Sequence, residues 1–301
     1  MKDALDHIFN IGPSIGYYVK RTKGVYLLGE CHNRKIALQH KQELINTYGF
    51  DEDMIRIHPK NGGDKLLYGA KVLGSYVGTE EYIATQLSKK LDKLSLEVDA
   101  ITSVSSLQVQ YLLLRWCFCQ KIIYLQRTIP AVLINRYLTP GFTALKKVIL
   151  NSILGRADGI DSATFALAEL HIQDLGLGLF NREDTSMAAY LASYIENYYE
   201  LAAFLSAKQP AHHYIARSLN EVHKQAAKGG PTIHQYLSQT LRRSQRSRVV
   251  DQFTSPRKVA WIESLRDPHA GLRLDFAPKT AMHRMSNDEF RVALTLRLHL
   301  P

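Results

Sequence analysis

The stretch that decides the fold of this chain is Ser105-Ser-Leu-Gln-Val-Gln-Tyr-Leu-Leu-Leu-Arg-Trp-Cys-Phe-Cys-Gln-Lys-Ile-Ile-Tyr-Leu-Gln126. Its apolar side chains recur at helical spacing, at Leu107, Tyr111, Leu114, Phe118, Ile122 and Leu125. Because apolar residues occupy most sides of such a helix, we expect it to be central and buried. Cys117 and Cys119 should point to different sides of it, and we interpret them as core-packing residues.

Helical periods continue on both sides of this segment. Thr79-Glu-Glu81 supplies an N-cap and acidic first-turn residues to a preceding helix. Pro130 should open a following helix, which Pro140 interrupts and which resumes to Leu154. We expect further helices over 161–171, 185–207, 212–227, 231–249 and 286–298, the last after the capping-box spacing Ser286-Asn-Asp-Glu289.

The amino-terminal part carries short β-like runs instead, at Ile15–Val19, Val25–Leu28, Met54–Ile57 and Lys71–Val77, with one amphipathic helix over 36–48. The predicted fold class is therefore α+β and mostly α. We expect three parts: a small α/β piece over 1–78, a helical region over 79–207, and a basic helical region over 208–301.

The charge of the chain is concentrated in that last part. The 301 residues carry 38 Lys+Arg and 28 Asp+Glu, 38 − 28 = +10. Residues 1–207 hold 22 and 21 of these, 22 − 21 = +1, whereas residues 208–301 hold 16 and 7, 16 − 7 = +9. The densest run is Leu241-Arg-Arg-Ser-Gln-Arg-Ser-Arg248. It fits a polyanion-binding site, a solvated helix face, or a localisation signal.

Several classes of protein are excluded by composition and missing motifs. At 46% hydrophobic residues the chain can bury a core, so disorder is not its main state. Three cysteines cannot build a disulfide framework, and CxxC, HExxH, GxSxG and GxxxxGK[ST] are all missing. We therefore expect no metal centre and no cofactor. No apolar run reaches the roughly 18 residues of a membrane span and no signal peptide is present, so we expect an intracellular protein, nuclear or cytoplasmic, without a membrane partner.

Three segments follow one another in a recognisable order: Ile15-Gly-Tyr-Tyr-Val-Lys-Arg-Thr-Lys23, Lys71-Val-Leu-Gly-Ser-Tyr-Val-Gly-Thr-Glu-Glu-Tyr82 and Tyr124-Leu-Gln-Arg-Thr-Ile-Pro130. This order resembles the carboxy-terminal part of reverse-transcriptase-like proteins from eukaryotic non-LTR-type retroelements. Two later segments are also similar to that family, Asp174-Leu-Gly-Leu-Gly-Leu-Phe-Asn181 and the closing Ser286–Pro301. The five segments occur in one order and are spread across most of the chain.

The resemblance assigns roles to individual residues. Lys23 occupies the place of a lysine near the incoming nucleotide, although Lys20 replaces the asparagine usual before it. Leu73 and Gly74 correspond to the turn of the hairpin that grips the primer end, and Arg127 belongs to a Leu-x-Arg-Thr-Ile-Pro signature in the helical region beyond. As ordinary residues, Lys23 is a surface lysine, Leu73-Gly74 a tight turn and Arg127 a helix-terminal cation.

The resemblance begins at the end of the palm, so it implies that the aspartates that hold Mg²⁺ in the family would lie before Met1. We therefore expect no unaided polymerase activity. The expected function is binding of RNA or DNA, as primer–template, through backbone phosphates, with a separate palm-containing polypeptide as a further partner. The expected nucleic-acid-binding residues are Lys23, Leu73, Gly74, Arg127, Arg242, Arg243, Arg246 and Arg248. Two alternatives stay open: a helical protein-interaction module without a nucleic-acid role, and a retroelement relic without function.

Overall fold

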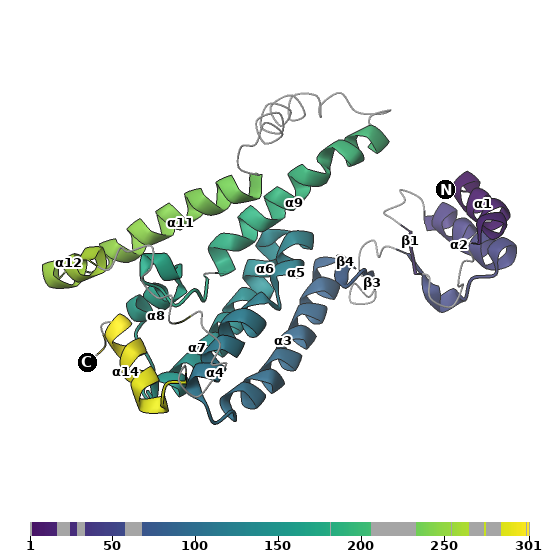
Figure 1. Cartoon of the computed structure of the whole chain (residues 1–301). Helices are drawn as coiled ribbons and strands as arrows, with labels where there is room; N and C mark the ends of the chain where they lie inside the picture. Colours follow the sequence, from purple (N-terminus) through teal and green to yellow (C-terminus); the bar gives the residue numbers. More distant parts are fainter. Residues whose placement is uncertain are drawn as a thin grey trace. The chain divides into compact units, whose positions relative to one another are not determined.

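The computed structural model describes residues 2–16, 25–28, 34–57, 68–180, 182–205, 233–253, 255–264, 274, 284–298 and 300. Within these ranges the chain is mostly helical and its strands form two small sheets (Figure 1), which confirms the predicted fold class. Contacts divide the chain into two compact units, 1–86 and 87–301. The boundaries expected at 78/79 and 207/208 remain predictions.

The first unit combines two helices with four short strands. Its elements are α1 (Lys2–Ile11), a 3-10 helix (Gly12–Ile15), β1 (Tyr26–Leu28), α2 (Arg34–Tyr48), a 3-10 helix (Glu52–Met54), β2 (Ile55–Ile57), β3 (Gly69–Val72) and β4 (Ser75–Gly78). β1 and β2 pair in parallel across α2, and β3 pairs with β4 in an antiparallel hairpin. The core between α1, α2 and the parallel pair consists of Leu5, Leu28, Leu44, Tyr48, Phe50 and Ile55.

Two of the strands predicted in this unit need correction. The run beginning at Ile15 was expected to be extended, but Ile15 ends a 3-10 helix that starts at Gly12-Pro13, where the fixed φ of proline favours a helical turn; residues 17–19 lie outside the described ranges. The run Lys71–Val77 forms two strands, because the chain reverses at Leu73-Gly74. The strands near 25–28 and 54–57 and the helix over 36–48 are confirmed.

The second unit is a helical assembly that begins within α3. Its described elements are α3 (Glu80–Thr102, shared with the first unit), α4 (Leu107–Leu112), a π-helical turn (Leu113–Cys117), a 3-10 turn (Phe118–Gln120), α5 (Ile123–Thr128), α6 (Ala131–Tyr137), α7 (Thr139–Leu154), α8 (Ser162–Glu169), a 3-10 turn (Ile172–Asp174), α9 (Arg182–Leu205), α11 (Ile233–Asp251), α12 (Pro256–Ser264) and α14 (Asn287–Arg297). The helix expected over 212–227 lies outside the described ranges.

The central segment 107–128 is buried as predicted, but it is not one regular helix. Tyr111, Leu114, Phe118 and Ile122 are fully buried. The helix widens to a π-helical turn and then tightens before α5 starts. Phe118, which follows the wide turn, stacks on Phe142 of α7 at 5.0 Å between ring centroids. The core-packing interpretation of the cysteines holds for Cys119, which is buried, and is wrong for Cys117, which is exposed because it faces the opposite side.

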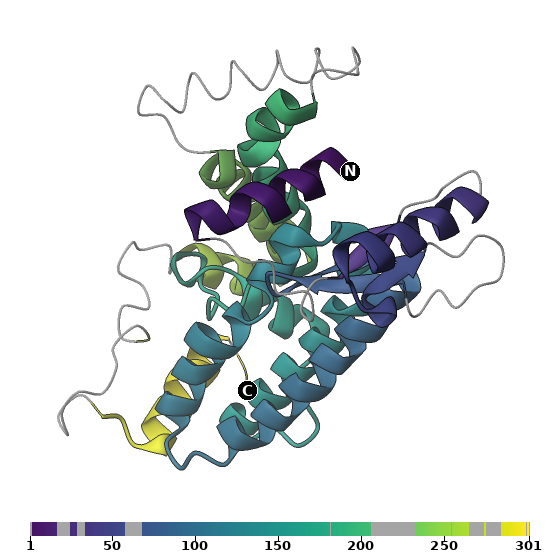
Figure 2. The same ribbon diagram turned by 90° about the vertical axis from the view of Figure 1, so that its right-hand side faces the viewer.

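The last described helix, α14, packs against the central helices of the second unit. α14 packs on α4 and α7 (Figures 1 and 2), and the rings of Phe290 and Tyr111 lie 5.8 Å apart. The Asn287 side chain accepts a hydrogen bond from the Leu107 amide at 3.0 Å and donates one to the Ser105 carbonyl at 2.9 Å. The predicted capping box of Ser286 with Glu289 is present. Residues about 180 positions apart are thus tied together.

Candidate nucleic-acid interface

The turn between β3 and β4 contains two of the predicted site residues. Val72 pairs with Ser75, so Leu73 and Gly74 alone form the turn, and both have positive φ, 48° and 92°. This is the backbone of the hairpin turn whose twist matches the flanking strands. Glycine adopts it without strain, whereas leucine does so at a cost of about 1–2 kcal/mol. The Leu73 side chain is nevertheless 91% exposed.

The other two residues taken from the resemblance lie elsewhere. Lys23 falls outside the described residues. Arg127 occupies the last turn of α5 and its side chain is exposed. A cation is favoured there by the helix dipole, so the position suits both a structural role and a phosphate contact. The hairpin turn belongs to the first unit and Arg127 to the second.

The arginine cluster lies on α11, where Arg242 and Arg248 bind acidic residues of the same chain. Arg242 forms an ion pair with Asp174 and donates a hydrogen bond to Gln173 at 3.2 Å. Arg248 forms an ion pair with Asp184 at 2.8 Å. These contacts attach α11 to the segment before α9 and to α9 itself. The roles of Arg243, which is exposed, and Arg246, which is half-buried, in nucleic-acid binding stay predictions.

Beneath this cluster lies a polar core that sequence reasoning missed. Residues 170–180, here called the glycine loop, have their carbonyl groups turned toward three buried side chains from different helices. Tyr111 donates to the Leu177 carbonyl at 2.8 Å, Arg297 to the Gly176 carbonyl at 3.1 Å, and Lys146 to the Phe180 carbonyl at 3.0 Å. These three carbonyl groups therefore have hydrogen-bond donors in the interior.

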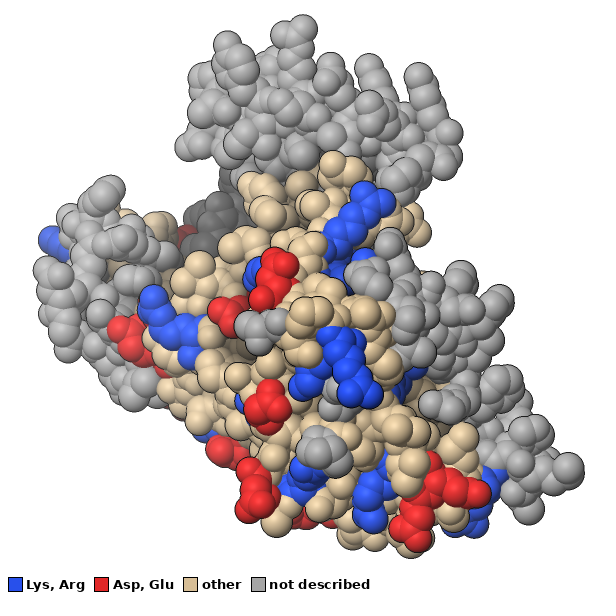
Figure 3. Space-filling view, turned by 90° about the vertical axis from the view of Figure 1, so that its left-hand side faces the viewer, with Lys and Arg blue, Asp and Glu red and all other residues tan. Residues whose placement is uncertain are grey.

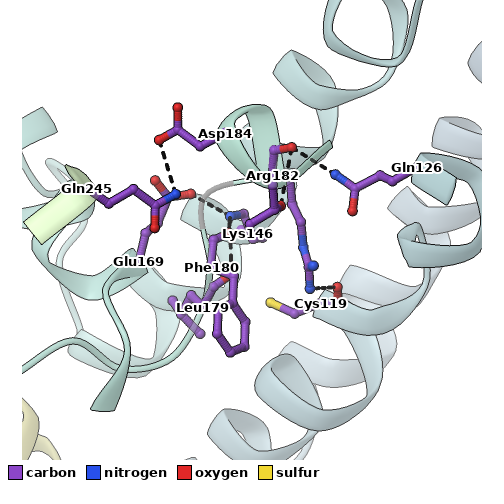
Figure 4. A network of polar contacts seen from close by, with 10 residues as sticks. Cys119, Gln126, Lys146, Glu169, Leu179, Phe180, Arg182, Asp184 and Gln245 are labelled. Carbon is purple, nitrogen blue, oxygen red and sulfur yellow. Dashed lines mark hydrogen bonds and ion pairs between the residues drawn. The ribbon is translucent and has the colours of Figure 1, made fainter. Parts of the chain in front are cut away.

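Lys146 is the centre of this polar core (Figure 4). Its side chain is 0% exposed, and its ammonium group lies 2.6 Å from a carboxylate oxygen of buried Glu169. Arg182 is also buried, its guanidinium donates to the Cys119 carbonyl, and its own carbonyl accepts from Gln126 at 2.8 Å. Burial lowers the pKa of Arg182.

One sequence signal could have found this core. Lys146 stands at a position of α7 where the helical period from Phe142 to Ile149, Leu150 and Ile153 calls for an apolar residue. A lysine on a buried helical face needs a partner. The sequence alone does not identify Glu169 as that partner, because Glu169 belongs to another helix.

The described residues offer no group of three or more His, Cys, Asp or Glu side chains arranged to hold a metal ion. Figure 3 shows one face of the molecule, where Lys and Arg side chains are interspersed with Asp and Glu. The surface of the described residues therefore offers exposed Lys and Arg side chains and exposed aromatic rings to a ligand.

No protein-family model matches the chain, and neither a curated protein nor a solved structure is significantly similar to it. None of the helices within the described ranges is both long and apolar enough to span a membrane.

The two described cysteines should differ sharply in reactivity. Burial raises the pKa of the Cys119 thiol, so little thiolate forms there at neutral pH, and the side chain is inaccessible. We expect iodoacetamide to alkylate Cys117 in the folded protein and to leave Cys119 unmodified until denaturant is added. Peptide mapping by mass spectrometry distinguishes the two sites. Equal labelling of both in the native protein would contradict the buried position of Cys119.

Proposed function

We propose that this chain is part of a reverse-transcriptase-like protein and binds primer–template nucleic acid through backbone phosphates. The proposal rests on the ordered motifs of the sequence and on its net charge of +10. Under this proposal a palm-containing polypeptide, which carries the catalytic carboxylates, is a further partner. The function of the chain itself is to hold nucleic acid.

The turn of the β3–β4 hairpin is the observation that carries the proposal. Leu73 adopts a left-handed backbone conformation, which costs free energy, although almost all of its side chain is exposed to water. Folding alone gives no reason for leucine there, since asparagine or glycine fits this turn better. Strain retained at an exposed position is typical of residues that contact a ligand. Lys71, exposed on β3 two residues earlier, supplies a cation beside it.

The variant Leu73→Asn should lower the affinity for duplex while it raises the free energy of unfolding. Asparagine tolerates positive φ, so we expect the free energy of unfolding to rise by up to about 1 kcal/mol. Affinity for a primer–template duplex should fall about tenfold, because the apolar contact of a leucine side chain is worth about 1.5 kcal/mol. Urea denaturation measures the first quantity and fluorescence anisotropy of a labelled duplex the second.

Leu38→Gln is the matched control, since Leu38 is an exposed leucine on α2 in the same unit. Its affinity for the duplex should equal that of the wild type. If Leu73→Asn binds duplex as tightly as the wild type does, the hairpin turn has no role in binding, and the interaction-module alternative gains.

A further inference from the structure

An exposed stripe of aromatic and basic side chains follows the central segment 107–128. Trp116 is 54% exposed and Tyr124 47% exposed, although both belong to the central segment, whose residues Phe118 and Ile122 are fully buried. Lys121 and Arg127 are exposed at intervening and following positions. Trp116 lies in the π-helical turn, Lys121 in the turn before α5, and Tyr124 and Arg127 in α5, and all four side chains are exposed. Phe118, Ile122 and Leu125 of the same segment are buried.

The π-helical turn and a buried arginine hold Trp116 in place. The Arg115 guanidinium lies 4.5 Å from the centroid of the Trp116 ring, and Arg115 is itself buried. A π-helical turn of this kind often occurs at functional sites. A base that stacks on the exposed indole would therefore contact a ring that already lies against a cation.

The charge around the stripe favours a polyanion. Between Asp99 and Asp158 the chain contains no acidic residue. The same interval contains seven basic residues, of which Arg115 and Lys146 are buried and Lys121 and Arg127 are exposed within the stripe. Glu97 of α3 lies beside the stripe, with its carboxylate 3.2 Å from the Lys121 ammonium group, and α9, which packs on α5, carries Glu183 and Asp184 in its first turn. Glu97 therefore offsets one of the cations.

We propose that this stripe binds single-stranded nucleic acid, with bases stacked on Trp116 and Tyr124 and phosphates contacted by Lys121 and Arg127. Aromatic rings beside cations are the usual platform for single strands, whatever their sequence. Of these four residues, Arg127 is also among those expected to bind the primer–template duplex.

Tryptophan fluorescence provides a direct readout of stacking. The chain has two tryptophans, Trp116 and Trp261, so the variant Trp261→Phe reports on Trp116 alone. Titration of this variant with oligo(dT) or oligo(U) should quench the fluorescence, and inorganic polyphosphate should not, because it has charge without bases. Quenching by polyphosphate to the same extent would show that charge alone is recognised and would overturn the proposal.

Anisotropy of labelled oligo(dT) then measures affinity. Trp116→Leu and Tyr124→Leu should each weaken binding by about 5- to 150-fold, the equivalent of about 1–3 kcal/mol per stacked base. Tyr236→Leu is the matched control, because Tyr236 is an exposed tyrosine on α11, and it should leave the affinity unchanged. Glu97→Gln should tighten binding about two- to fivefold, a gain that misfolding cannot produce.

Two results would overturn the proposal: no binding of oligo(dT) and oligo(U) by the full chain at low salt, or equal affinities of Trp116→Leu, Tyr124→Leu and the wild type. Duplex affinity, measured in parallel, separates the two proposals. Duplex binding that is lost in Leu73→Asn but kept in Trp116→Leu supports the proposed function alone. Single-strand binding without duplex binding supports the stripe alone.

Discussion

Replacing Lys146 by methionine should lower the free energy of unfolding by about 3–5 kcal/mol, the cost of leaving a buried charge without its partner. Methionine fills a similar volume, so lost packing is not the cause. The variant leaves the Glu169 carboxylate, 2.6 Å from the former ammonium group, unpaired in the interior. It also removes the donor to the Phe180 carbonyl. Urea denaturation of the full chain measures the change.

A double-mutant cycle identifies the cause of this loss. Replacing Glu169 by leucine in the Lys146→Met background removes the unpaired charge, so the double variant should be more stable than Lys146→Met alone. It should not reach wild-type stability, because the Phe180 carbonyl still lacks its donor. Lys147→Met is the control: Lys147 is half-buried, 4.8 Å from the Phe165 ring, and its loss should cost less than about 1 kcal/mol. Equal effects of Lys146→Met and Lys147→Met would contradict the buried ion pair.

Adding one methyl group to the glycine loop, in Gly176→Ala, should destabilise the chain by about 3 kcal/mol or more, at or above the upper end of typical overpacking costs. A Cβ at Gly176 would lie 1.8 Å from the Leu170 carbonyl oxygen, a backbone atom that cannot swing aside. The Gly176 amide is hydrogen-bonded to the His171 carbonyl at 3.0 Å, so the loop cannot shift without losing that bond. Thermal and urea unfolding both report the effect.

Gly159→Ala provides the comparison for that variant. Gly159 has a φ of 78°, and its Cβ would come no nearer than 3.4 Å to a side-chain nitrogen of Asn151. Alanine there costs only the backbone strain of about 1–2 kcal/mol. A Gly176→Ala variant no less stable than Gly159→Ala would mean that the loop does not pack against residue 170 as described.

The sequence predicted the helical elements well because their signals are local. The capping box at Ser286 is present as expected, and Pro130 stands at the start of α6, the helix that it was expected to open. Local patterns failed at two kinds of position. The chain reverses at Leu73-Gly74, in the middle of a β-like run. Leucine is not a usual turn residue, so the residue pattern alone predicts one continuous strand there. The π-helical turn Leu113–Cys117 keeps a helical hydrophobic period, so periodicity cannot reveal it.

The candidate sites were less predictable than the fold. The turn role of Leu73 and Gly74 came from the family resemblance and agrees with the backbone of the hairpin, whereas their contact with nucleic acid stays a prediction. The partners of Arg242 and Arg248, Asp174 and Asp184, are more than 60 residues distant in sequence. Contacts of that kind depend on how helices pack, which charge counting along the sequence does not determine. The exposure of the Trp116 side chain also depends on how the helices pack, so the sequence alone did not predict it.

Binding of a primer–template duplex over a series of salt concentrations tests the proposed function most directly. If basic side chains contact backbone phosphates, log K should fall linearly with log salt between about 50 and 200 mM, with a slope of about −0.9 for each phosphate contacted. Duplexes of different sequence should show similar affinities. Undetectable binding at the lowest salt concentration, or an affinity that does not change with salt, would contradict the proposal.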